Sequence, residues 1–328
     1  MAACLLLAGC GAPKGGNIRV RIGNPGNGLQ TWCLPITLAH SLGYYKEEGL
    51  DVSLENLASG AKSMQALVGG SVDVGGFLYE RNLEIAAEGQ HVRSFFIMTR
   101  RDGRVLIVAP KANERVRRAE DLKGGLIGVS TFGAGNHQLT NYYLAAHGVR
   151  PSEISAVAIG LGASALAAIE AGRVDAAMLS GGDHFHLLRR HPGLRILVDT
   201  STLDGMRETY GNGAYAGGAL SAKQEWLDRN PDTARRLARA LQHTLQWLGT
   251  HTPEEIRERL PESFRSQDAA VDLDIIRWSL PSFPADGTMQ QGAPETMKRF
   301  LDASVDKVRN AKIDLAATWT NEFLPGPK

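Results

Sequence analysis

Hydrophobic and polar residues follow two different periods along the first two thirds of the chain, and the two periods alternate. Stretches with a period of two, or with a short continuous apolar run, predict β-strands, and stretches with apolar residues every three or four positions predict helices. The predicted strands cover residues 17–23, 51–57, 72–77, 92–98, 105–109, 126–130, 156–159, 174–179 and 195–199. The predicted helices cover residues 36–45, 59–68, 79–88, 136–146, 163–171 and 183–190. This alternation is typical of parallel sheets built from strand–helix–strand units.

The last third of the chain has a different character, because charged helices replace the alternation with strands. Pro231, Pro253 and Pro294 stand at the starts of three of these helices, where the first turn tolerates proline because its N–H would have no partner. The helices are predicted over residues 223–229, 231–248, 253–259, 268–279 and 294–308.

Two segments repeat one sequence pattern, and the repeat predicts two lobes of one design. Residues 60–67 and 162–169 both begin with Gly-Ala and continue as a short apolar helix. A glycine follows each helix, Gly70 or Gly172, and the chain then enters a strand through Val-Asp. Any helix-to-strand turn can look like this, but recurrence over the whole unit favours a structural duplication.

The N-terminus is apolar and ends in Leu-Ala-Gly-Cys at residues 7–10. This pattern is typical of a bacterial lipobox, in which Cys10 is acylated and becomes the mature N-terminus. We therefore interpret residues 1–16 as a lipoprotein signal remnant and tether, with a lipid on Cys10 as a membrane anchor. A chance apolar tail is the alternative, because residues 1–9 contain no Lys or Arg.

Composition narrows the class of protein. The chain has 328 residues, of which 43% are hydrophobic and 22% charged, as is ordinary for a soluble globular protein with one large or two smaller domains. Its formal net charge of +1 gives no reason to expect a nucleic-acid partner. Cys33 is the one cysteine beyond residue 16, so the folded body cannot form an intramolecular disulfide, and we interpret Cys33 as a small buried apolar residue.

Four segments in order resemble the nitrate/sulfonate/taurine-type substrate-binding proteins of ABC transporters. They are PITLAHSLGYYKEEGLDV at residues 35–52, SGAKSMQALVGGSVDVG at 59–75, EDLKGGLIGV at 120–129 and ALAAIEAGRVDAAML at 165–179. The resemblance covers the chain from about residue 17 to at least residue 248. That family shares its fold with the yeast-type thiamine-pyrimidine synthases.

The resemblance implies an α/β protein with the two-lobed periplasmic-binding-protein fold of type II. Each lobe would be a mainly parallel sheet flanked by helices, and two hinge crossovers would join the lobes. The implied function is that of a monomeric, extracytoplasmic solute receptor that delivers a small molecule to an ABC permease. It would lie in the periplasm or at the cell surface, attached to the membrane by its lipid.

The crossovers are expected where short extended stretches rich in valine or glycine lie between the lobes. We place them at residues 104–110 and 214–221. The first lobe would then consist of residues 17–106 with 218–328, and the second of residues 107–217. The C-terminal helices would pack on the first lobe.

Ligands of open α/β sheets bind beyond the carboxyl ends of the strands, against helix N-termini. Two glycine-containing turns are expected there, one after each of two predicted strands, and their exposed N–H groups would clamp an anionic head group such as a sulfonate or carboxylate. A simple N-capped turn, with Ser59 or Thr131 as the cap, is the alternative for each. The candidate residues are Ser59, Gly60, Ala61 and Lys62 in the first turn, and Thr131, Phe132, Gly133, Gly135, Asn136 and His137 in the second.

Aromatic side chains near these turns suit an organic ligand body. Trp32, Phe77, Tyr79 and Phe132 are the candidates, and packing in the core is the alternative for them. The loop at residues 24–30 is expected at the mouth of the cleft.

Gly182 and Asp183 stand at the end of the predicted strand in the second repeat. The matching strand in the first repeat ends at Tyr79. Asp183 would bind an amine or hydroxyl group if its side chain faces the cleft, and it would be a helix cap if it does not. His184 and His186 stand close together, but no carboxylate or cysteine cluster accompanies them. We therefore expect a surface helix here, with no metal site and no cofactor.

An enzyme is the competing hypothesis, in the form of thiamine-pyrimidine precursor binding or a synthase-like activity. The cysteine-rich cofactor site of such synthases would leave clustered cysteines, which the sequence lacks. A nucleophile elbow, a phosphate-binding loop and paired catalytic carboxylates are also missing. We therefore expect a binding protein and not an enzyme. A sensor domain is a weaker alternative, since no DNA-binding segment accompanies the chain.

Overall fold

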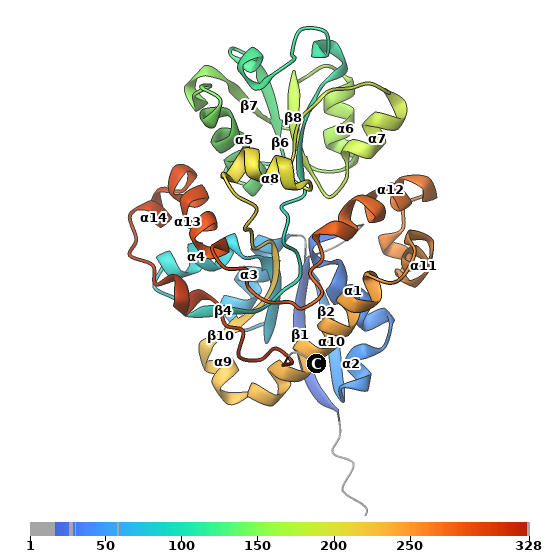
Figure 1. Ribbon diagram of the computed structural model, residues 1–328, viewed down its shortest axis with the longest axis vertical. Helices are drawn as coiled ribbons and strands as arrows, with labels where there is room; N and C mark the ends of the chain where they lie inside the picture. The colour runs from blue at the N-terminus through green and yellow to red at the C-terminus, as the bar shows by residue number, and fades with distance from the viewer. Residues whose placement is uncertain (1–16, 26–28, 30, 58, 327–328) are drawn as a thin grey trace, which may run out of the picture.

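The computed structural model describes residues 17–25, 29, 31–57 and 59–326, which form two five-stranded sheets placed one above the other (Figure 1). Cys4 and Cys10, with the predicted lipobox, lie outside the described residues. We call the part of the chain around each sheet a lobe. Neighbouring α-helices flank both sheets (Figure 1).

The first sheet has the strand order β2-β1-β3-β10-β4. Strand β1 pairs in parallel with β2 and β3, whereas β10 runs antiparallel to β3 and β4. The strands are β1 (Ile18–Pro25), β2 (Leu50–Leu57), β3 (Val74–Leu78), β4 (Val92–Ile97) and β10 (Gly218–Lys223). The helices between them are α1 (Leu34–Ser41), α2 (Tyr44–Glu47), α3 (Gly60–Gly69) and α4 (Glu80–Ala87).

The second sheet repeats this topology with the strand order β7-β6-β8-β5-β9. Here β5 is the single reversed strand and takes the place that β10 has in the first sheet. The strands are β5 (Arg104–Val108), β6 (Leu126–Val129), β7 (Ser155–Ala158), β8 (Ala176–Ser180) and β9 (Ile196–Asp199). The helices are α5 (Gly135–Ala146), α6 (Ala163–Glu170), α7 (His184–Arg190) and α8 (Leu203–Tyr210). The predicted fold class, with two mainly parallel sheets flanked by helices, is confirmed.

The sequence repeat corresponds to equal contacts in the two lobes. Asp73, just before β3, accepts a hydrogen bond from the N–H of Arg21 at 2.8 Å, and its own N–H donates to the carbonyl of Arg21 at 2.9 Å. Asp175, just before β8, makes the same two bonds with Leu126, at 2.8 and 2.7 Å. The Val-Asp pattern therefore marks the same interaction in both lobes: an aspartate forms hydrogen bonds that connect the start of the central strand to its parallel neighbour.

The chain passes between the sheets at residues 98–103 and again at residues 211–217. The first position differs from the predicted crossover at 104–110, because Arg104–Val108 is hydrogen-bonded to β8 and β9 inside the second sheet. The predicted boundary at 106/107 would cut through this strand. Residues 105–109 were predicted both as a strand and as part of a hinge; the strand is present, and the chain crosses between the lobes before it. We propose lobes divided at the two observed crossings.

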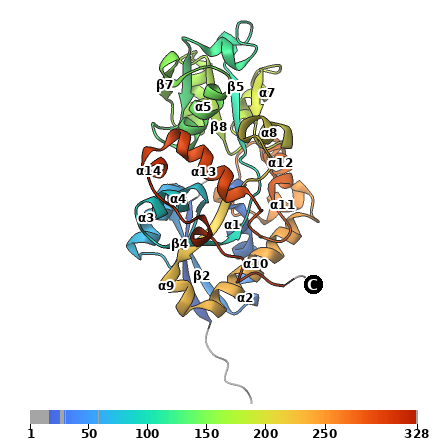
Figure 2. The same ribbon diagram turned by 60° about the vertical axis from the view of Figure 1, so that its left-hand side comes forward.

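The C-terminal helices do more than cover the first lobe. Helix α10 packs against α1 and α2, as expected, but α12 contacts α7 of the second lobe and α13 contacts α5 (Figure 2). Both helices also pack on the first lobe, α12 on the 3₁₀ helix at Thr31–Cys33 and α13 on α4. The prediction that they pack on the first lobe therefore holds, but it left out their contacts with the second lobe. The helices are α9 (Gln224–Arg229), α10 (Pro231–Leu248), α11 (Pro253–Arg259), α12 (Ala269–Ser279), α13 (Ala293–Ser304) and α14 (Asp306–Arg309).

Short 3₁₀ helices connect several elements and cover Thr31–Cys33, Pro110–Ala112, Ala119–Leu122, Pro151–Glu153, Glu262–Phe264, Leu280–Ser282 and Leu315–Thr318. Across the described part of the chain, none of the helices combines the length and the apolar character that crossing a membrane requires.

Buried apolar residues form a core in each lobe and one core that both lobes share. The shared core contains Tyr79 and Leu83 of the first lobe, Leu106 and Tyr143 of the second, and Phe300 of α13, all of them 2% exposed or less. Helix α13 lies between α4 and α5 in Figure 2, so its apolar face closes this core from the side. Cys33 is fully buried in the first lobe, as predicted.

Candidate functional site

A cavity of about 650 Å³ lies between the two sheets. The turns that follow β1, β2 and β3 line it from the first lobe, and the turns that follow β6, β7 and β8 line it from the second. Both sheets thus present the carboxyl ends of their parallel strands to one space, which is where open α/β sheets bind ligands. We call this cavity the cleft.

The cleft lining mixes apolar, small and charged residues. From the first lobe come Leu29, Thr31, Trp32, Ser59, Gly60, Leu78, Glu80 and Arg81. From the first crossing and the second lobe come Asp102, Gly103, Arg104, Ser130, Ala134, Gly135, Asn136, Leu161, Gly162, Ser180, Gly181, Asp183 and His186. The C-terminal region adds Phe264, Arg265, Ser266, Asp272 and Ile275.

Six of the candidate residues line the cleft, and they come from both lobes. They are Trp32, Ser59, Gly60, Gly135, Asn136 and Asp183. The structure places the other candidates outside the lining: Ala61, Lys62, Phe77, Tyr79, Thr131, Phe132, Gly133, His137 and Gly182. Of the loop at 24–30, Leu29 lines the cleft, and residues 26–28 and 30 lie outside the described residues.

The turn before α3 exposes backbone donors to the cleft. The Ser59 side chain caps the helix by accepting a hydrogen bond from the Lys62 N–H at 3.3 Å, so the capping alternative is true for Ser59. The N–H of Gly60 has no hydrogen-bond partner among the described residues. Lys62 is exposed and donates to the Gln65 side chain at 3.2 Å, so its charge lies along the helix surface.

The turn before α5 approaches the cleft from the second lobe. Asn136 accepts hydrogen bonds from the N–H and hydroxyl of Ser130 and donates to the Met178 carbonyl at 3.1 Å, which fixes the end of β6 beside β8. Gly135 lies just before it, and the Gly135 N–H also has no partner among the described residues. The amide side chain of Asn136 is therefore committed to the fold, and the turn offers a backbone donor instead.

Residues 131–134 form a loop that closes on itself. Phe132 is 65% exposed, and its ring meets His137 edge-on with 5.9 Å between ring centroids. The Nδ1 atom of His137 accepts a hydrogen bond from the Gly133 N–H at 2.9 Å. Thr131 does not cap α5, because the described helix start has no side-chain cap. Contacts within the loop therefore hold Thr131, Phe132 and Gly133 away from the cleft lining, whereas Ala134 is part of it.

Phe77 and Tyr79 pack in the core and do not line the cleft, so the alternative of core packing is correct for both. Phe77 is fully buried with Leu67 and Ile85 beneath β3. Tyr79 is also fully buried, and its hydroxyl lies 2.5 Å from the Thr318 hydroxyl. Leu78, the last residue of β3, is half-buried and lines the cleft, whereas its neighbours Phe77 and Tyr79 pack in the core.

Three of the residues that line the cleft form a buried ion network, which no local sequence pattern predicted. Arg104 donates to both carboxylate oxygens of Glu80 at 3.2 and 3.3 Å, and its Nε lies 3.3 Å from Asp102. All three side chains are 4% exposed or less. Tyr210 and Tyr215 donate to Asp102 at 2.8 and 2.9 Å.

The contacts within this network shift the pKa values of its own charged groups, which line the cleft. Burial alone would lower the pKa of Arg104, but Asp102 and Glu80 outweigh this effect and raise it, so the guanidinium stays charged. Burial raises the pKa of Asp102, while Arg104 and the tyrosine hydroxyls act in the opposite direction. Because Glu80 belongs to the first lobe and Arg104 to the second, the pair also ties the lobes together.

Asp183 is not a helix cap, although it stands at the N-cap position of α7. Its side chain makes no capping hydrogen bond, and Oδ2 accepts from the N–H of Gly162 in the neighbouring turn at 3.0 Å. Beside it, Gly182 has a φ of 89°, and a Cβ there would lie 2.6 Å from Ile275 of α12. Gly182 therefore lets α12 approach closely and is not itself part of the lining.

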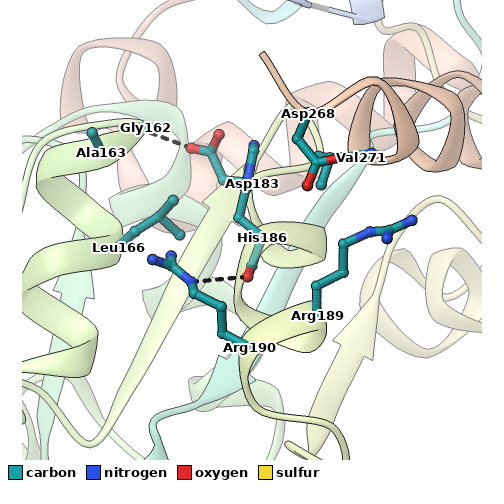
Figure 3. A pocket seen from close by; sticks show the side chains of 9 residues that line it. All are labelled: Gly162, Ala163, Leu166, Asp183, His186, Arg189, Arg190, Asp268 and Val271. Carbon is teal, nitrogen blue, oxygen red and sulfur yellow. Dashed lines mark hydrogen bonds between the residues drawn. The ribbon is translucent and has the colours of Figure 1, made fainter. Parts of the chain in front are cut away.

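A second cavity of about 390 Å³ adjoins the cleft and shares Gly162, Asp183 and His186 with it (Figure 3). Asp268 and Val271 at the start of α12 border the cavity opposite α7 (Figure 3). The described residues contain no group of three His, Cys, Asp or Glu side chains placed to hold a metal ion.

His184 is buried, so the prediction of a surface helix is wrong at this position. It is 2% exposed and packs against Phe185 and Trp278, with ring centroids 4.2 and 5.1 Å away. Burial lowers its pKa to about 4, from 6.5 in an exposed histidine, although Asp199 acts in the opposite direction. The imidazole is therefore neutral at pH 7 and belongs to the contact between α7 and α12.

Stability should consequently depend on pH through His184. Between pH 6.5 and 4 the unfolded chain binds a proton at this residue and the folded chain does not, so the free energy of unfolding should fall as the pH falls through this range. The shift corresponds to a loss of roughly 3 kcal/mol. Urea unfolding of the parent and of His184→Gln at several pH values measures it. The variant should lose less stability than the parent over this range, and equal pH profiles would contradict the assignment.

These features define a class of protein: two α/β lobes with a ligand cleft between the carboxyl ends of their strands. Residues 30–256 match the family described as NMT1/THI5 like, and the chain belongs to this family. YtlA of Bacillus subtilis (strain 168), which is named only as a binding protein, is 24% identical over 279 residues, covering 82% of this chain and 79% of YtlA.

Solved structures share the fold. A protein from Bordetella bronchiseptica RB50 is 33% identical, with a TM-score of 0.81 over 94% of this chain and 96% of that one. The periplasmic aliphatic sulphonate binding protein SsuA from Escherichia coli is 19% identical, with a TM-score of 0.71 over 93% of this chain and 99% of SsuA. The resemblance predicted from four sequence segments is therefore confirmed at the level of family and fold.

Proposed function

We propose that this protein is the extracytoplasmic solute-binding component of an ABC importer and that it holds a small organic anion in the cleft. One observation carries the proposal: turns from both lobes place the N-termini of α3 and α5 at one cavity, with the N–H groups of Gly60 and Gly135 lacking partners among the described residues. A helix N-terminus carries about half a positive charge, which favours an anionic head group. The names of YtlA and SsuA support binding rather than catalysis.

The lining also suits an organic body attached to the anionic group. Trp32, Leu161 and Ile275 offer apolar surface, and the cavity of about 650 Å³ is large enough for a small molecule. The proposed ligand is a sulfonate of the taurine type or an aromatic acid, and nitrate is the smallest member of the predicted class.

The proposed partner is a membrane permease, and the protein would act as a monomer. The lipobox pattern supports an anchor on Cys10 that holds the receptor at the membrane surface in the periplasm or on the cell surface. A pyrimidine-precursor receptor is the second candidate, because Trp32 and Phe264 provide aromatic surface in the cleft. A synthase is less well supported, since Cys33 is the one cysteine beyond residue 16.

Binding should be detectable as thermal stabilisation by a solute from a panel of sulfonates, carboxylates, nitrate and pyrimidines. A ligand present at a hundred times its dissociation constant should add about 2.7 kcal/mol to the free energy of unfolding. Gly60→Val should weaken the binding about tenfold or more, because its Cβ would lie 3.4 Å from both Trp32 and Phe77 and its methyl groups would narrow the cleft.

Gly69→Val is the matched control, since it changes the same residue type at the other end of α3, where a Cβ meets nothing within 4 Å. Calorimetry on both variants separates obstruction of the cleft from a general effect on the helix. Equal affinities of Gly60→Val and the parent would place the binding site elsewhere. Turnover of the ligand to a product would overturn the receptor assignment.

A further inference from the structure

Two C-terminal helices bridge the lobes, and they do so on opposite sides of the molecule (Figure 1). Helix α12 contacts α7 of the second lobe, and α13 contacts α5 of the same lobe. Both helices also pack on the first lobe, α12 on the 3₁₀ helix at Thr31–Cys33 and α13 on α4. The way in which the lobes can part therefore depends on which of the two bridges is the weaker.

The bridge at α12 depends on polar contacts near the surface. The Trp278 Nε1 atom donates a hydrogen bond to Asp199, the last residue of β9, at 3.1 Å. The Oδ2 atom of Asp274 accepts hydrogen bonds from Nε and Nη2 of Arg189 on α7, at 3.2 and 2.6 Å. The Arg189 side chain is exposed and that of Asp274 is partly exposed. Because water screens such an ion pair, it contributes little to holding the two helices together.

The contact between α7 and α12, which we call the seam, is also incompletely packed. The cavity of about 390 Å³ that adjoins the cleft separates α7 from the start of α12, at Asp268 and Val271 (Figure 3). The other end of α12 is better packed, because the Trp278 ring meets His184 there, with 5.1 Å between ring centroids. This end lies at the first crossing, since a Cβ at Gly103 would lie 3.3 Å from the Trp278 ring. The seam is therefore most open at the end farther from the crossing.

When the seam is closed, α12 forms one wall of the cleft. Asp272 and Ile275 of this helix line the cleft. Ile275 fits closely against Gly182 of the second lobe, where a Cβ would lie 2.6 Å from its side chain. Val271, Ile275 and Ile276 are buried in the core of the first lobe, so this wall would move with the first lobe if the lobes parted.

The bridge at α13 is apolar and buried. Phe300 of α13 is fully buried in the core that both lobes share, together with Leu83 of the first lobe and Leu106 of the second. Parting the lobes here would expose these side chains to water, at a cost that grows with the apolar area exposed. The second crossing is also tied to this helix, because Asn212 donates a hydrogen bond to Thr296 at 3.2 Å. The α13 side is therefore the stronger bridge.

We propose that the cleft opens along the seam between α7 and α12 while the α13 side stays packed, so that α12 acts as a latch at the entrance to the cleft. This inference rests on the proposed function and concerns how that site is controlled. Opening breaks the ion pair between Arg189 and Asp274 and withdraws the wall that Asp272 and Ile275 form. A solute that contacts this wall favours the closed state, because only the closed state offers the complete site.

Distances between pairs of spin labels on exposed residues test the direction of opening in the solute-free protein. One pair, at Glu258 of α11 and Arg190 of α7, spans the seam. The other pair, at Asp306 of α14 and Ala145 of α5, spans the α13 side. Double electron–electron resonance should show a second, longer distance for the seam pair and a single distance for the α13 pair.

The labels are attached to cysteines introduced at these four positions. The chain used carries Cys4→Ser and Cys10→Ser, and Cys33 is fully buried, so the labels react at the chosen sites. A saturating concentration of a panel solute that binds should remove the longer distance of the seam pair.

Asp274→Asn should raise the population of the longer seam distance by about two- to fivefold, which is the range expected from the loss of an exposed ion pair. The α13 pair should keep its single distance in this variant. Asp302→Asn is the matched control, because Asp302 pairs with Lys298 at 2.6 Å within α13 and makes no ion pair across the lobes. The control should leave the distances of both pairs unchanged.

A longer distance at the α13 pair, equal lengthening of both pairs, or an unchanged seam pair in Asp274→Asn would overturn the inference. So would a longer seam distance that persists in the presence of saturating solute. In each of these cases the proposed function still stands if a solute binds and Gly60→Val weakens that binding. The proposed function fails separately if no solute of the panel binds.

Discussion

Replacing Arg104 by methionine is expected to lower the free energy of unfolding by about 3–5 kcal/mol, one of the largest effects of any single substitution in this protein. The substitution leaves Glu80 and Asp102 buried without their shared cation. Removing one partner of a buried ion pair is strongly destabilising because the remaining charge keeps its desolvation cost and loses its compensation. Chemical denaturation of the parent and the variant at pH 7 measures this difference.

Arg118→Met is the matched control for this prediction. The Arg118 side chain is 73% exposed, and its ion pairs with Glu120 and Asp121 are 3.8 and 3.7 Å long. Exposed pairs contribute little, so the control should change the free energy of unfolding by less than about 1 kcal/mol. Adding Glu80→Gln to Arg104→Met should restore part of the lost stability, because it removes one of the two uncompensated carboxylates. Equal stabilities of Arg104→Met and Arg118→Met would contradict the structural role of the network.

Phe300→Ala is the second substitution with a large expected effect, a loss of about 3–5 kcal/mol of unfolding free energy. Phe300 is fully buried on α13, and its ring meets Tyr142 and Tyr210 edge-on, with 5.3 and 5.8 Å between ring centroids. It belongs to the core that both lobes share with Leu83 and Leu106. The cavity left by alanine would therefore weaken the packing within the second lobe and between the lobes at once.

Calorimetric unfolding of Phe300→Ala tests both consequences. The midpoint temperature should fall, and the single transition expected of the parent should broaden because the lobes lose common contacts. Phe132→Ala is the control, since Phe132 is 65% exposed and its removal should change stability by about 0.5 kcal/mol or less. A parent-like midpoint for Phe300→Ala would show that α13 does not hold the lobes together.

The fold was predictable because its signals are local. Alternating periods gave most strands and helices, and the Val-Asp repeat located the two central strands at Asp73 and Asp175. Helix α8 was missed although Leu203, Met206 and Tyr210 recur at helical spacing, because the segment is short and contains Gly205 among charged residues. Its start depends on the Thr202 side chain, which accepts a hydrogen bond from the Gly205 N–H at 3.0 Å.

The candidate site was predictable only in part, because its charges depend on contacts between distant residues. The turns at Ser59 and Gly135 follow strands directly, so their place at the strand ends could be inferred. Asp102 is 108 residues from Tyr210, and neither position shows a local pattern that reveals the hydrogen bond. The orientation of Asp183 was open for the same reason: its partner, Gly162, lies 21 residues earlier.

The position of β10 has a consequence for the order in which the chain acquires its structure. Strand β4 joins the described first sheet through β10, which follows the whole second lobe in the sequence. Residues 104–210 can complete their own sheet from contiguous sequence, whereas β3 and β4 must wait with open edges. Such edges invite aggregation, and pairings between distant segments form slowly. We therefore expect the second lobe to complete its sheet from contiguous sequence, whereas β4 is secured only when β10 pairs with it.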